Sequence, residues 1–380
     1  MAERKRMLVI GDGAAGVIIA NKTRLKVAKS DLEIIVVGNS PEHYFRPDGI
    51  QIPVGLKDYR TSIKPTRFLL NYDIDYVRDQ VTGISAADRK VKLQSGKEMS
   101  FDFLVIATGN RFTPEDMPGY SQSARHFYDL EHALALRSDI ENFTGGDIVI
   151  GRASEPIMCP PAPFEMTLLL DSYFRRKGIR DKVTLSYLYP LDSTYSLPNV
   201  AKILYNIFDE RNIKCYESFN AESIDPEGHR VNSYEGESVK FDLLIMIPPH
   251  RGQKVMTDSG LADEYGYIDV DKHYLNYKDY DDIFVIGDAT NLPLSKAGSV
   301  AHLQSDFLSS YLAAKIVGGQ SQDGYDGLTA CFAETGMGEG LTMYYSHTKK
   351  EKAFFTSSVD HLLKWSSSYT YFSTMVRGIA

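Results

Sequence analysis

The chain has 380 residues and a mass of 42.6 kDa, which at roughly 100 to 200 residues per domain allows two or three domains. Hydrophobic residues make up 43% and charged residues 24% of the chain, with 29 Gly and 16 Pro, so the composition excludes a disordered, collagenous or low-complexity protein. The formal net charge of −8 and the lack of a basic tract disfavour a nucleic-acid partner, because phosphates are neutralised by a basic protein face.

The N-terminal apolar run, residues 7–10, stops at Gly11 and is shorter than the roughly 7 to 15 residues of a signal-peptide core. No uninterrupted apolar run approaches the roughly 18 residues that span a bilayer. The three cysteines, Cys159, Cys215 and Cys331, are too few and too far apart for a disulfide framework or a CxxC metal site. We therefore expect a soluble or monotopic protein of the reducing cytoplasm, with no bound metal.

Residues 7–37 are predicted to form a strand, a glycine turn, a helix and a second strand. The turn, residues 11–16, has the GxGxxG pattern of a dinucleotide-binding unit. Gly11 permits the tight turn, Gly13 lets a pyrophosphate approach the backbone, and Gly16 lets the helix pack on the strand. The helix N-terminus offers free N–H groups to phosphates. A glycine-rich turn without a ligand is the plainer alternative, but the flanking elements favour nucleotide binding.

The end of the second predicted strand lacks the acidic residue that binds a ribose hydroxyl in many such units. Gly38 stands there, followed by Asn39. Asn39 offers a neutral hydrogen-bonding group in its place. This difference does not by itself decide between a flavin and a nicotinamide nucleotide.

Two later segments repeat one pattern. Residues 101–109 and 241–249 each combine an aromatic-Asp step with a buried strand and a turn. Each follows a meander of short alternating segments, residues 77–99 and 214–240, which is typical of a β excursion from a Rossmann-like unit. The repeat predicts two related units, the second beginning near Gly146.

The second unit has no phosphate-binding fingerprint. After Gly151 the loop contains four prolines and Cys159, and no GxGxxG pattern. Proline has no backbone N–H, so this loop cannot form the nest of donors that holds a pyrophosphate. We expect the second unit to lack an NAD site.

A further element ends the strand of residues 282–286 with Gly287-Asp288-Ala289. Asp288 can accept from a sugar-like hydroxyl chain, or it can cap the next turn; the local sequence leaves both open. Lys296 and Gly298 follow at the start of an apolar helical stretch, whose N-terminus would stabilise negative charge. His302, within that stretch, is expected to be structural.

Together, these features resemble the flavoproteins with two dinucleotide-binding domains. Within them, residues 159–165, Cys-Pro-Pro-Ala-Pro-Phe-Glu, are similar to the cysteine loop of sulfide:quinone oxidoreductases and of the flavoprotein subunit of flavocytochrome c sulfide dehydrogenase. Residues 44–47, Tyr-Phe-Arg-Pro, residues 293–298, and residues 325–327 with Cys331 shortly after, also look like that family. The resemblance covers about residues 5 to 345.

The resemblance implies an α/β fold with two tandem Rossmann-like domains of the FAD/NAD(P)-binding type and a C-terminal membrane- or quinone-associated region. The FAD domain is expected at residues 1–110 and 275–315. The second domain, with its degenerate NAD site, is expected at 111–274, and the C-terminal region with an amphipathic helix at 316–380.

The implied cofactor is FAD. Some members of the family have an earlier cysteine, in some cases linked covalently to the flavin, but no cysteine precedes Cys159 here. We therefore expect noncovalent FAD. Lys296 would lie by the flavin pyrimidine and Asp288 would hold the ribityl chain. The residues expected to contact the cofactor are Gly11, Gly13, Ala14, Ala15, Gly16, Asn39, Arg46, Thr108, Gly109, Gly287, Asp288, Lys296 and Gly298.

The implied reaction uses Cys159 and Cys331 as a redox pair. Hydrosulfide attacks a disulfide or sulfur bridge between them, the released thiolate adds to the flavin and reduces it, and a quinone takes the electrons. Glu165 is expected either to accept a proton near Cys159 or simply to stabilise the first turn of a helix. Cys215 is expected to be an ordinary strand residue. The alternatives are a type II NADH:quinone dehydrogenase-like enzyme and a non-catalytic flavin-binding sensor.

Apolar residues recur at roughly helical spacing near the C-terminus, downstream of all the cysteines and flavin motifs. They suit a helix lying in a membrane interface beside a quinone entry, with the protein peripheral on the cytoplasmic side. A helix packed on its own domain or on a second subunit of a homo-oligomer is the alternative. The residues are Phe354, Phe355, Val359, Leu362, Leu363, Trp365, Tyr369, Tyr371, Phe372, Met375 and Val376.

Overall fold

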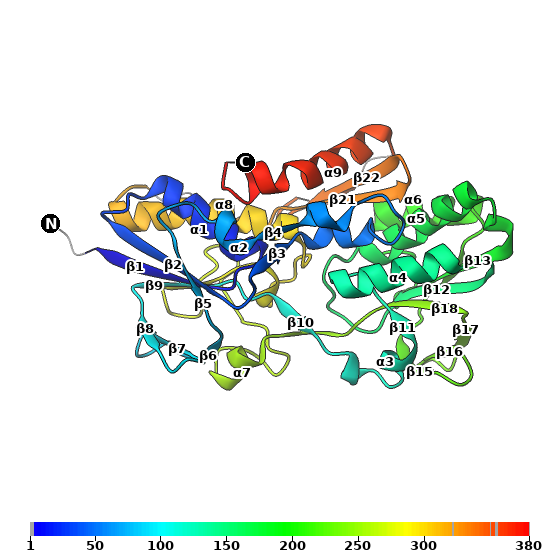
Figure 1. Ribbon diagram of the computed structural model, residues 1–380, viewed down its shortest axis with the longest axis horizontal. Coiled ribbons are helices and arrows are strands. Elements are labelled where there is room, and N and C mark those ends of the chain that lie inside the picture. Colours follow the sequence, from blue (N-terminus) through cyan, green and yellow to red (C-terminus); the bar gives the residue numbers. More distant parts are fainter. Residues whose placement is uncertain (1–3, 321–322, 350, 354–355, 380) are drawn as a thin grey trace.

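The computed structural model describes residues 4–320, 323–349, 351–353 and 356–379. Its first domain is built on a five-stranded parallel sheet with the order β20-β9-β1-β2-β5, on the left of Figure 1. Because the strands are parallel, their carboxyl ends share one edge, where such sheets bind ligands. The elements are β1 (Lys5–Ile10), α1 (Ala14–Lys26), β2 (Leu32–Gly38), β5 (Asp75–Arg78), β9 (Phe103–Ile106), β20 (Ile283–Val285) and α8 (Gly298–Val317).

The second domain repeats this plan with the parallel strand order β11-β18-β12-β13-β14. The carboxylate of Asp129 caps α4 by accepting from the His132 N–H, and α5 ends at Gly178 in the left-handed conformation that favours glycine. The elements are β11 (Ala124–Arg125), α4 (Leu130–Asn142), β12 (Gly146–Arg152), α5 (Ala162–Lys177), β13 (Val183–Leu188), α6 (Pro198–Glu210), β14 (Lys214–Tyr216) and β18 (Leu243–Ile247).

The predicted internal repeat and the α/β fold with two Rossmann-like units are confirmed. Each domain carries a three-stranded antiparallel meander, before β9 in the first domain and before β18 in the second. The first is β6 (Val81–Ser85), β7 (Lys90–Leu93) and β8 (Glu98–Ser100). The second is β15 (Ala221–Asp225), β16 (Arg230–Ser233) and β17 (Ser238–Lys240). Short elements complete the domains: β3 (Glu42–Tyr44), β4 (Ile63–Pro65), α2 (Thr66–Leu69), α3 (Tyr120–Ser123) and α7 (Lys254–Asp258).

The chain crosses between the domains on two antiparallel strands, β10 (Asn110–Phe112) and β19 (His250–Gly252). The return to the first domain comes at about residue 250, earlier than the expected residue 275. Met256, Leu261 and Ile268 pack in the same hydrophobic cluster as Leu8 and Ile10. This return is set by long-range packing, which no local sequence pattern indicates.

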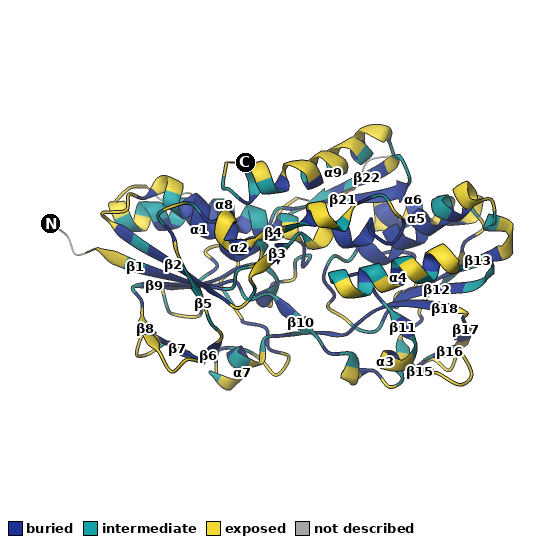
Figure 2. Ribbon diagram, in the orientation of Figure 1, coloured by how far each residue is buried: buried dark blue, intermediate teal, exposed yellow. Residues whose placement is uncertain are grey.

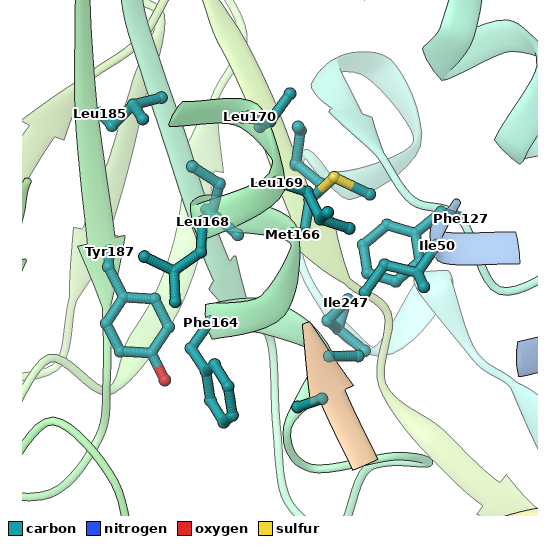
Figure 3. Close-up of a cluster of buried hydrophobic side chains, with 14 of the residues drawn as sticks. Ile50, Phe127, Phe164, Met166, Leu168, Leu169, Leu170, Leu185, Tyr187 and Ile247 are labelled. Atoms are coloured by element: carbon teal, nitrogen blue, oxygen red, sulfur yellow. The ribbon is translucent and has the colours of Figure 1, made fainter. Parts of the chain in front are cut away.

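The largest hydrophobic cluster lies under α5 in the second domain (Figure 3). Five consecutive α5 side chains from Met166 to Leu170 include no exposed residue, because sheet, loop and C-terminal strands cover the helix all round. Each fully buried aliphatic side chain contributes about 1.5–3 kcal/mol of transfer free energy. The labelled members are Ile50, Phe127, Phe164, Met166, Leu168, Leu169, Leu170, Leu185, Tyr187 and Ile247. This packing holds the start of α5, and with it the cysteine loop, in place.

The C-terminal region lies across both domains (Figure 1). It consists of the antiparallel strands β21 (Thr329–Gly336), β22 (Glu339–Tyr345) and β23 (Lys352–Ala353), followed by α9 (Ser358–Thr370). β21 packs on α5, and α9 packs on β21 and β22. The late cysteine, Cys331, is thereby carried to the second domain by β21.

The last long helix, α9, is amphipathic, but it buries its polar face and exposes its apolar face. Its buried stripe is polar, with Asp360, Lys364 and Ser368 spaced four residues apart and hence on one face. Its exposed face carries large apolar side chains: Val359 (64% exposed), Leu362 (56%), Leu363 (45%), Trp365 (43%) and Tyr369 (58%). Figure 2 shows this exposed face along the outer edge of the molecule.

The predicted apolar face does not extend to the end of the tail. Tyr371 and Val376 are buried in the core of the first domain. The Tyr371 hydroxyl and His43 Nε2 lie 2.7 Å apart, and Asn21 donates to the Val376 carbonyl. Phe354 and Phe355 lie outside the described residues. In the described parts of the chain, no helix is both long enough and apolar enough to cross a membrane.

Candidate active site

The glycine turn between β1 and α1 has the geometry expected of a phosphate cradle. Gly11 has a φ of +109°, and a Cβ on Gly16 would lie 1.8 Å from the Gly11 carbonyl oxygen, so both positions require glycine. A Cβ on Gly13 would meet no atom within 4 Å. The space over Gly13 is therefore left open by the protein, beside the first-turn residues Ala14 and Ala15 of α1.

At the end of β2, the place of the missing acidic residue is taken by the carboxylate of Asp12. The Asp12 carboxylate lies over Gly38, where a Cβ would be 2.2 Å from it. It accepts from the Ser40 N–H at 3.1 Å and the Tyr76 hydroxyl at 2.8 Å. Asn39 is exposed at the end of β2. The sequence analysis overlooked Asp12, although an acid inside the glycine turn was the available signal.

Several buried polar atoms at this edge have no protein partner among the described residues. They include Tyr44 Oη, Thr108 Oγ1 and Asn110 Nδ2. Buried polar atoms are normally hydrogen-bonded, so these atoms favour a polar ligand, and a Cβ on Gly109 would again meet no atom within 4 Å. The open glycines and the unpaired donors fit FAD, which the expected contact residues could hold.

Asp288 and Lys296 lie together at the end of β20, which positions both at the same edge. Burial raises the pKa of the Asp288 carboxyl, and the Lys296 charge opposes this. Burial lowers the pKa of Lys296 to about 8. The Lys296 ammonium donates to the carbonyls of Asp288 (3.1 Å) and Thr290 (2.7 Å) and lies 4.1 Å from the Tyr267 ring centroid. Lys296 is thus a fixed cationic group inside the site.

The loop that contains Cys159 is hydrogen-bonded to the segment that contains Lys296. The Cys159 N–H donates to the Lys296 carbonyl at 2.7 Å, and Cys159 has a φ of +52°, a conformation that non-glycine residues seldom adopt. Arg46 Nη1 lies 4.0 Å from the Met158 sulfur. Tyr128 donates its hydroxyl hydrogen to the Met158 carbonyl. Cys159 is thereby held beside Lys296 and Arg46, two of the residues expected to contact the cofactor.

Cys159 lies close enough to Cys331 for the two thiols to interact electrostatically, whereas Cys215 lies on β14 opposite Tyr187 of β13. All three are free thiols. Burial raises the pKa of Cys159 to about 12, with a smaller contribution from the neighbouring Cys331 and an opposing one from Lys364. Burial also raises the pKa of Cys331. Both thiols are therefore poor nucleophiles when reduced, unless a nearby group stabilises the thiolate.

A cavity of about 200 Å³ opens beside Cys331. Its walls come from the loop around Glu155 and Pro160, the segment of Tyr195, the Ser295–Lys296 turn and β22. Cys159 is not among its lining residues. A small solute in this cavity therefore meets Cys331 first.

The first turn of α5 carries Glu165, whose side chain is 2% exposed. It forms an ion pair with Lys364 of α9, whose side chain is 11% exposed. Lys364 also faces Cys159, and burial lowers the pKa of this lysine to about 8. Lys364 was not among the predicted site residues, which all lie upstream of the tail, because the tail was assigned to a membrane interface.

A second polar cluster fixes α9 to the first domain. Asp48, 2% exposed, accepts from the hydroxyls of Ser62 (2.7 Å) and Ser368 (2.6 Å). Lys57 donates to Ser368 at 2.5 Å and pairs with Asp48 at 3.4 Å. Removing one member of such a buried network leaves an unpaired charge. Together with Glu165, this cluster explains why α9 turns its polar face inward.

The carboxyl edge of the second sheet is closed by protein groups. Arg152, at the end of β12, pairs with Glu155 at 2.6 Å and lies 4.3 Å from the ring centroid of Tyr189. The side chain of Arg152 is 5% exposed. With prolines in place of a glycine turn, this edge offers no cradle for a dinucleotide phosphate.

One group of possible metal ligands lies near the cysteine loop. Atoms of His126, Asp129 and His132 come within 4.8 Å of one another. However, Asp129 accepts from the His132 N–H and lies 2.8 Å from its ring Nδ1. The two imidazoles stack at 3.9 Å with their planes 20° apart, so their in-plane lone pairs do not converge on one ion. The group forms a helix cap in this conformation.

Comparisons with known proteins were made against this geometry. Residues 5–151 match the family described as pyridine nucleotide-disulphide oxidoreductase. The chain is 25% identical to the mitochondrial sulfide:quinone oxidoreductase of Mus musculus over 98% of this chain and 86% of that protein. It is 22% identical to a type II NADH:quinone oxidoreductase of Staphylococcus haemolyticus over 94% of each. The X-ray structure of the sulfide:quinone oxidoreductase from Aquifex aeolicus superposes with a TM-score of 0.88 at 20% identity, covering 99% of this chain and 92% of that one.

The open space over Gly13 leads to a prediction about the affinity for FAD. Gly13→Ala should leave the thermal unfolding of the apoprotein unchanged, because its φ of −75° suits alanine. It should weaken FAD binding about tenfold or more, equal to about 1.4 kcal/mol, because the methyl group enters the phosphate site. Titration of apoprotein with FAD measures this. Gly83→Ala, on the β6 meander, is the matched control, and equal affinity of the two variants would contradict the assignment.

The Lys364–Glu165 pair predicts strong coupling between α9 and α5. Lys364→Met should lower the free energy of unfolding by about 3–5 kcal/mol, because it leaves the buried carboxylate of Glu165 without a partner charge. Adding Glu165→Gln should restore part of this loss. Urea unfolding of both single variants and the double variant measures the coupling. Lys254→Met, which removes an exposed pair with Asp258, should have little effect. Additive losses at Lys364 and Glu165 would disprove the pairing.

Proposed function

We propose that this chain, which belongs to the sulfide:quinone oxidoreductase family of flavoproteins, oxidises sulfide through Cys159 and Cys331 and passes the electrons to a quinone. The chain is an FAD-dependent oxidoreductase. The observation that carries the specific proposal is the meeting of two cysteines, 172 positions apart in the sequence, beside a cavity and the Lys296 turn. Two thiols that can form and break a disulfide supply both a site for sulfur and a path for two electrons.

The position of the cavity indicates which of the two cysteine sulfurs hydrosulfide attacks. In the oxidised enzyme Cys159 and Cys331 form a disulfide, and hydrosulfide entering the cavity attacks the Cys331 sulfur. A new sulfur–sulfur bond forms to Cys331, the bond to Cys159 breaks, and its electron pair leaves on Cys159 as a thiolate. The Lys364 charge stabilises that thiolate, since it lowers the pKa of Cys159. When bound, FAD accepts the two electrons.

We propose that FAD is bound without a covalent bond. The chain has three cysteines and none precedes Cys159, while Cys215 lies on β14 of the second domain. The glycine turn, Thr108 and Asp288 supply polar contacts instead. Denaturation should therefore release the flavin.

Glu165 and Lys364 are assigned to proton transfer near Cys159. They are the buried acid and base that lie against the cysteine loop in the described chain. Sulfide oxidation releases a proton, and quinone reduction consumes protons, so a paired carboxylate and ammonium beside the thiol can hold the proton between the two half-reactions.

The two alternative functions are less well supported. A type II NADH:quinone oxidoreductase needs a nucleotide site in the second domain, where Arg152, Glu155 and Tyr189 close the sheet edge. A non-catalytic sensor would not require a reactive cysteine pair beside an open cavity. The cysteines therefore favour turnover with sulfide.

We propose that the exposed face of α9 lies in the membrane interface, on the cytoplasmic side, beside the entry of the quinone. Its apolar side chains include Trp365 and Tyr369, residue types suited to such a boundary. The same face is available to a second copy of the chain in a homo-oligomer. The inward polar stripe excludes the reverse arrangement, in which this apolar face packs on its own domain.

The assignment of Cys159 and Cys331 as the redox pair predicts that the three cysteine variants differ in the reduction of the flavin by sulfide. Cys159→Ser and Cys331→Ser should each abolish reduction of the flavin by sulfide while FAD stays bound, because neither can form the disulfide. Cys215→Ser should behave like the wild type. Anaerobic single-turnover mixing, with flavin content checked beforehand, makes the comparison. Normal reduction in Cys159→Ser would refute this mechanism.

The α9 assignment is tested without deleting the helix, since deletion would remove Lys364. Leu362→Glu and Trp365→Glu should weaken binding to liposomes about tenfold or more, because each buried CH₂ contributes about 0.8 kcal/mol. Reduction of the flavin by sulfide should be unchanged. Tyr234→Glu, between β16 and β17 of the second domain, replaces a side chain that is 72% exposed and is the control. Unchanged liposome binding with loss of a dimer would identify α9 as a subunit interface instead.

A further inference from the structure

Cys331 lies close to two hydroxyl groups, one from the first turn of α8 and one from the segment that precedes this helix. Ser299, the second residue of this helix, places its Oγ 4.0 Å from the Cys331 sulfur. The helix has no side-chain cap and no acidic residue in its first turn, so its N-terminus keeps its positive character. The sulfur of Cys331 therefore lies near a hydroxyl and the positive end of a 20-residue helix.

The second hydroxyl belongs to Ser295. Its Oγ is buried and has no hydrogen-bond partner in the described part of the chain, which is uncommon for a buried hydroxyl. Ser295 lines the same cavity as Cys331. Its backbone is fixed, because its N–H donates to the Tyr345 hydroxyl at 3.2 Å. A sulfur atom attached to Cys331 and extending into the cavity would meet this unpaired hydroxyl.

Cys159 and Cys331 differ in what stabilises their anions. The Cys159 thiolate has the Lys364 charge beside it. For Cys331, the groups that favour the anion are the Ser299 hydroxyl, which contacts the sulfur, and the Ser295 hydroxyl, which lies within reach of it but does not contact it in the reduced protein. The Lys296 ammonium, although near, is engaged by two carbonyls and the Tyr267 ring. Hydrogen bonds to a charged acceptor are stronger than neutral ones.

We propose that Ser295 and Ser299 form a two-donor cradle for the sulfur anion carried by Cys331, Ser299 at the Cys331 sulfur and Ser295 at a second sulfur bound to it. The proposal rests on the proposed function. Hydrosulfide attack on the disulfide leaves Cys331–S–SH and a Cys159 thiolate, and loss of the persulfide proton to solvent gives Cys331–S–S⁻. The cradle stabilises this anion, as it stabilises the simple thiolate of reduced Cys331.

The thiolate of Cys331 gives a readout that does not depend on sulfide turnover. In FAD-loaded Cys159→Ser/Cys215→Ser protein, Cys331 is the single remaining cysteine, and its alkylation by iodoacetamide as a function of pH reports its ionisation. The titratable and charged groups facing it, Glu155, Tyr195, Lys296 and Tyr345, are retained throughout. In this background, Ser299→Ala should raise the alkylation midpoint by about one pH unit. Ser295→Ala should raise it by a smaller amount.

Ser299→Thr, which keeps the hydroxyl, should restore the midpoint, and Ser310→Ala, farther along α8, should leave it unchanged. In protein with all cysteines, Ser299→Ala and Ser295→Ala should each slow reduction of the flavin by sulfide about tenfold, with normal FAD content. Unchanged midpoints in both alanine variants would overturn the cradle. Failure of sulfide to reduce the flavin of the unsubstituted protein would instead overturn the proposed function, and the alkylation midpoints would still decide the cradle.

Discussion

The buried ion pair between Lys364 and Glu165 joins the last long helix to the helix that follows the cysteine loop. Two opposite charges removed from water must stay together, because separating them leaves an unpaired charge in an apolar surrounding. This constraint fixes which face of α9 turns inward, and the Asp48 cluster supports the same orientation. As a result the apolar face of α9 is left outside, and a cation is left beside Cys159.

The groups that we assign to the active site come from both domains and from the C-terminal region. β20 and its turn supply Asp288 and Lys296, the loop before α5 supplies Cys159, and β21 supplies Cys331. The bond from the Cys159 N–H to the Lys296 carbonyl ties two of these segments together. The cavity beside Cys331 is lined in part by Lys296 of this junction.

The sequence predicted the parts of the structure that depend on local pattern. The glycine turn was predictable because its tight backbone requires glycine at positions 11 and 16, and the GxGxxG pattern shows this in the sequence. The repeated meander predicted the second domain. The position of Lys364 and the early return of the chain near residue 250 depend on long-range contacts, and no spacing in the sequence encodes them. Asp12 was visible inside the glycine turn, but its contacts with Ser40 and Tyr76 join distant segments. Tyr371 was assigned to an exposed apolar face because periodicity cannot distinguish a membrane from a domain core.

The central claim is that electrons enter the flavin from sulfide through the cysteine pair. Anaerobic mixing of the purified, FAD-loaded protein with sulfide, and separately with NADH, tests it most directly by following the flavin absorbance. The account predicts that sulfide bleaches the flavin in a single rapid phase, while NADH leaves it oxidised because the second domain has no nucleotide cradle. Bleaching by NADH with no response to sulfide would contradict it.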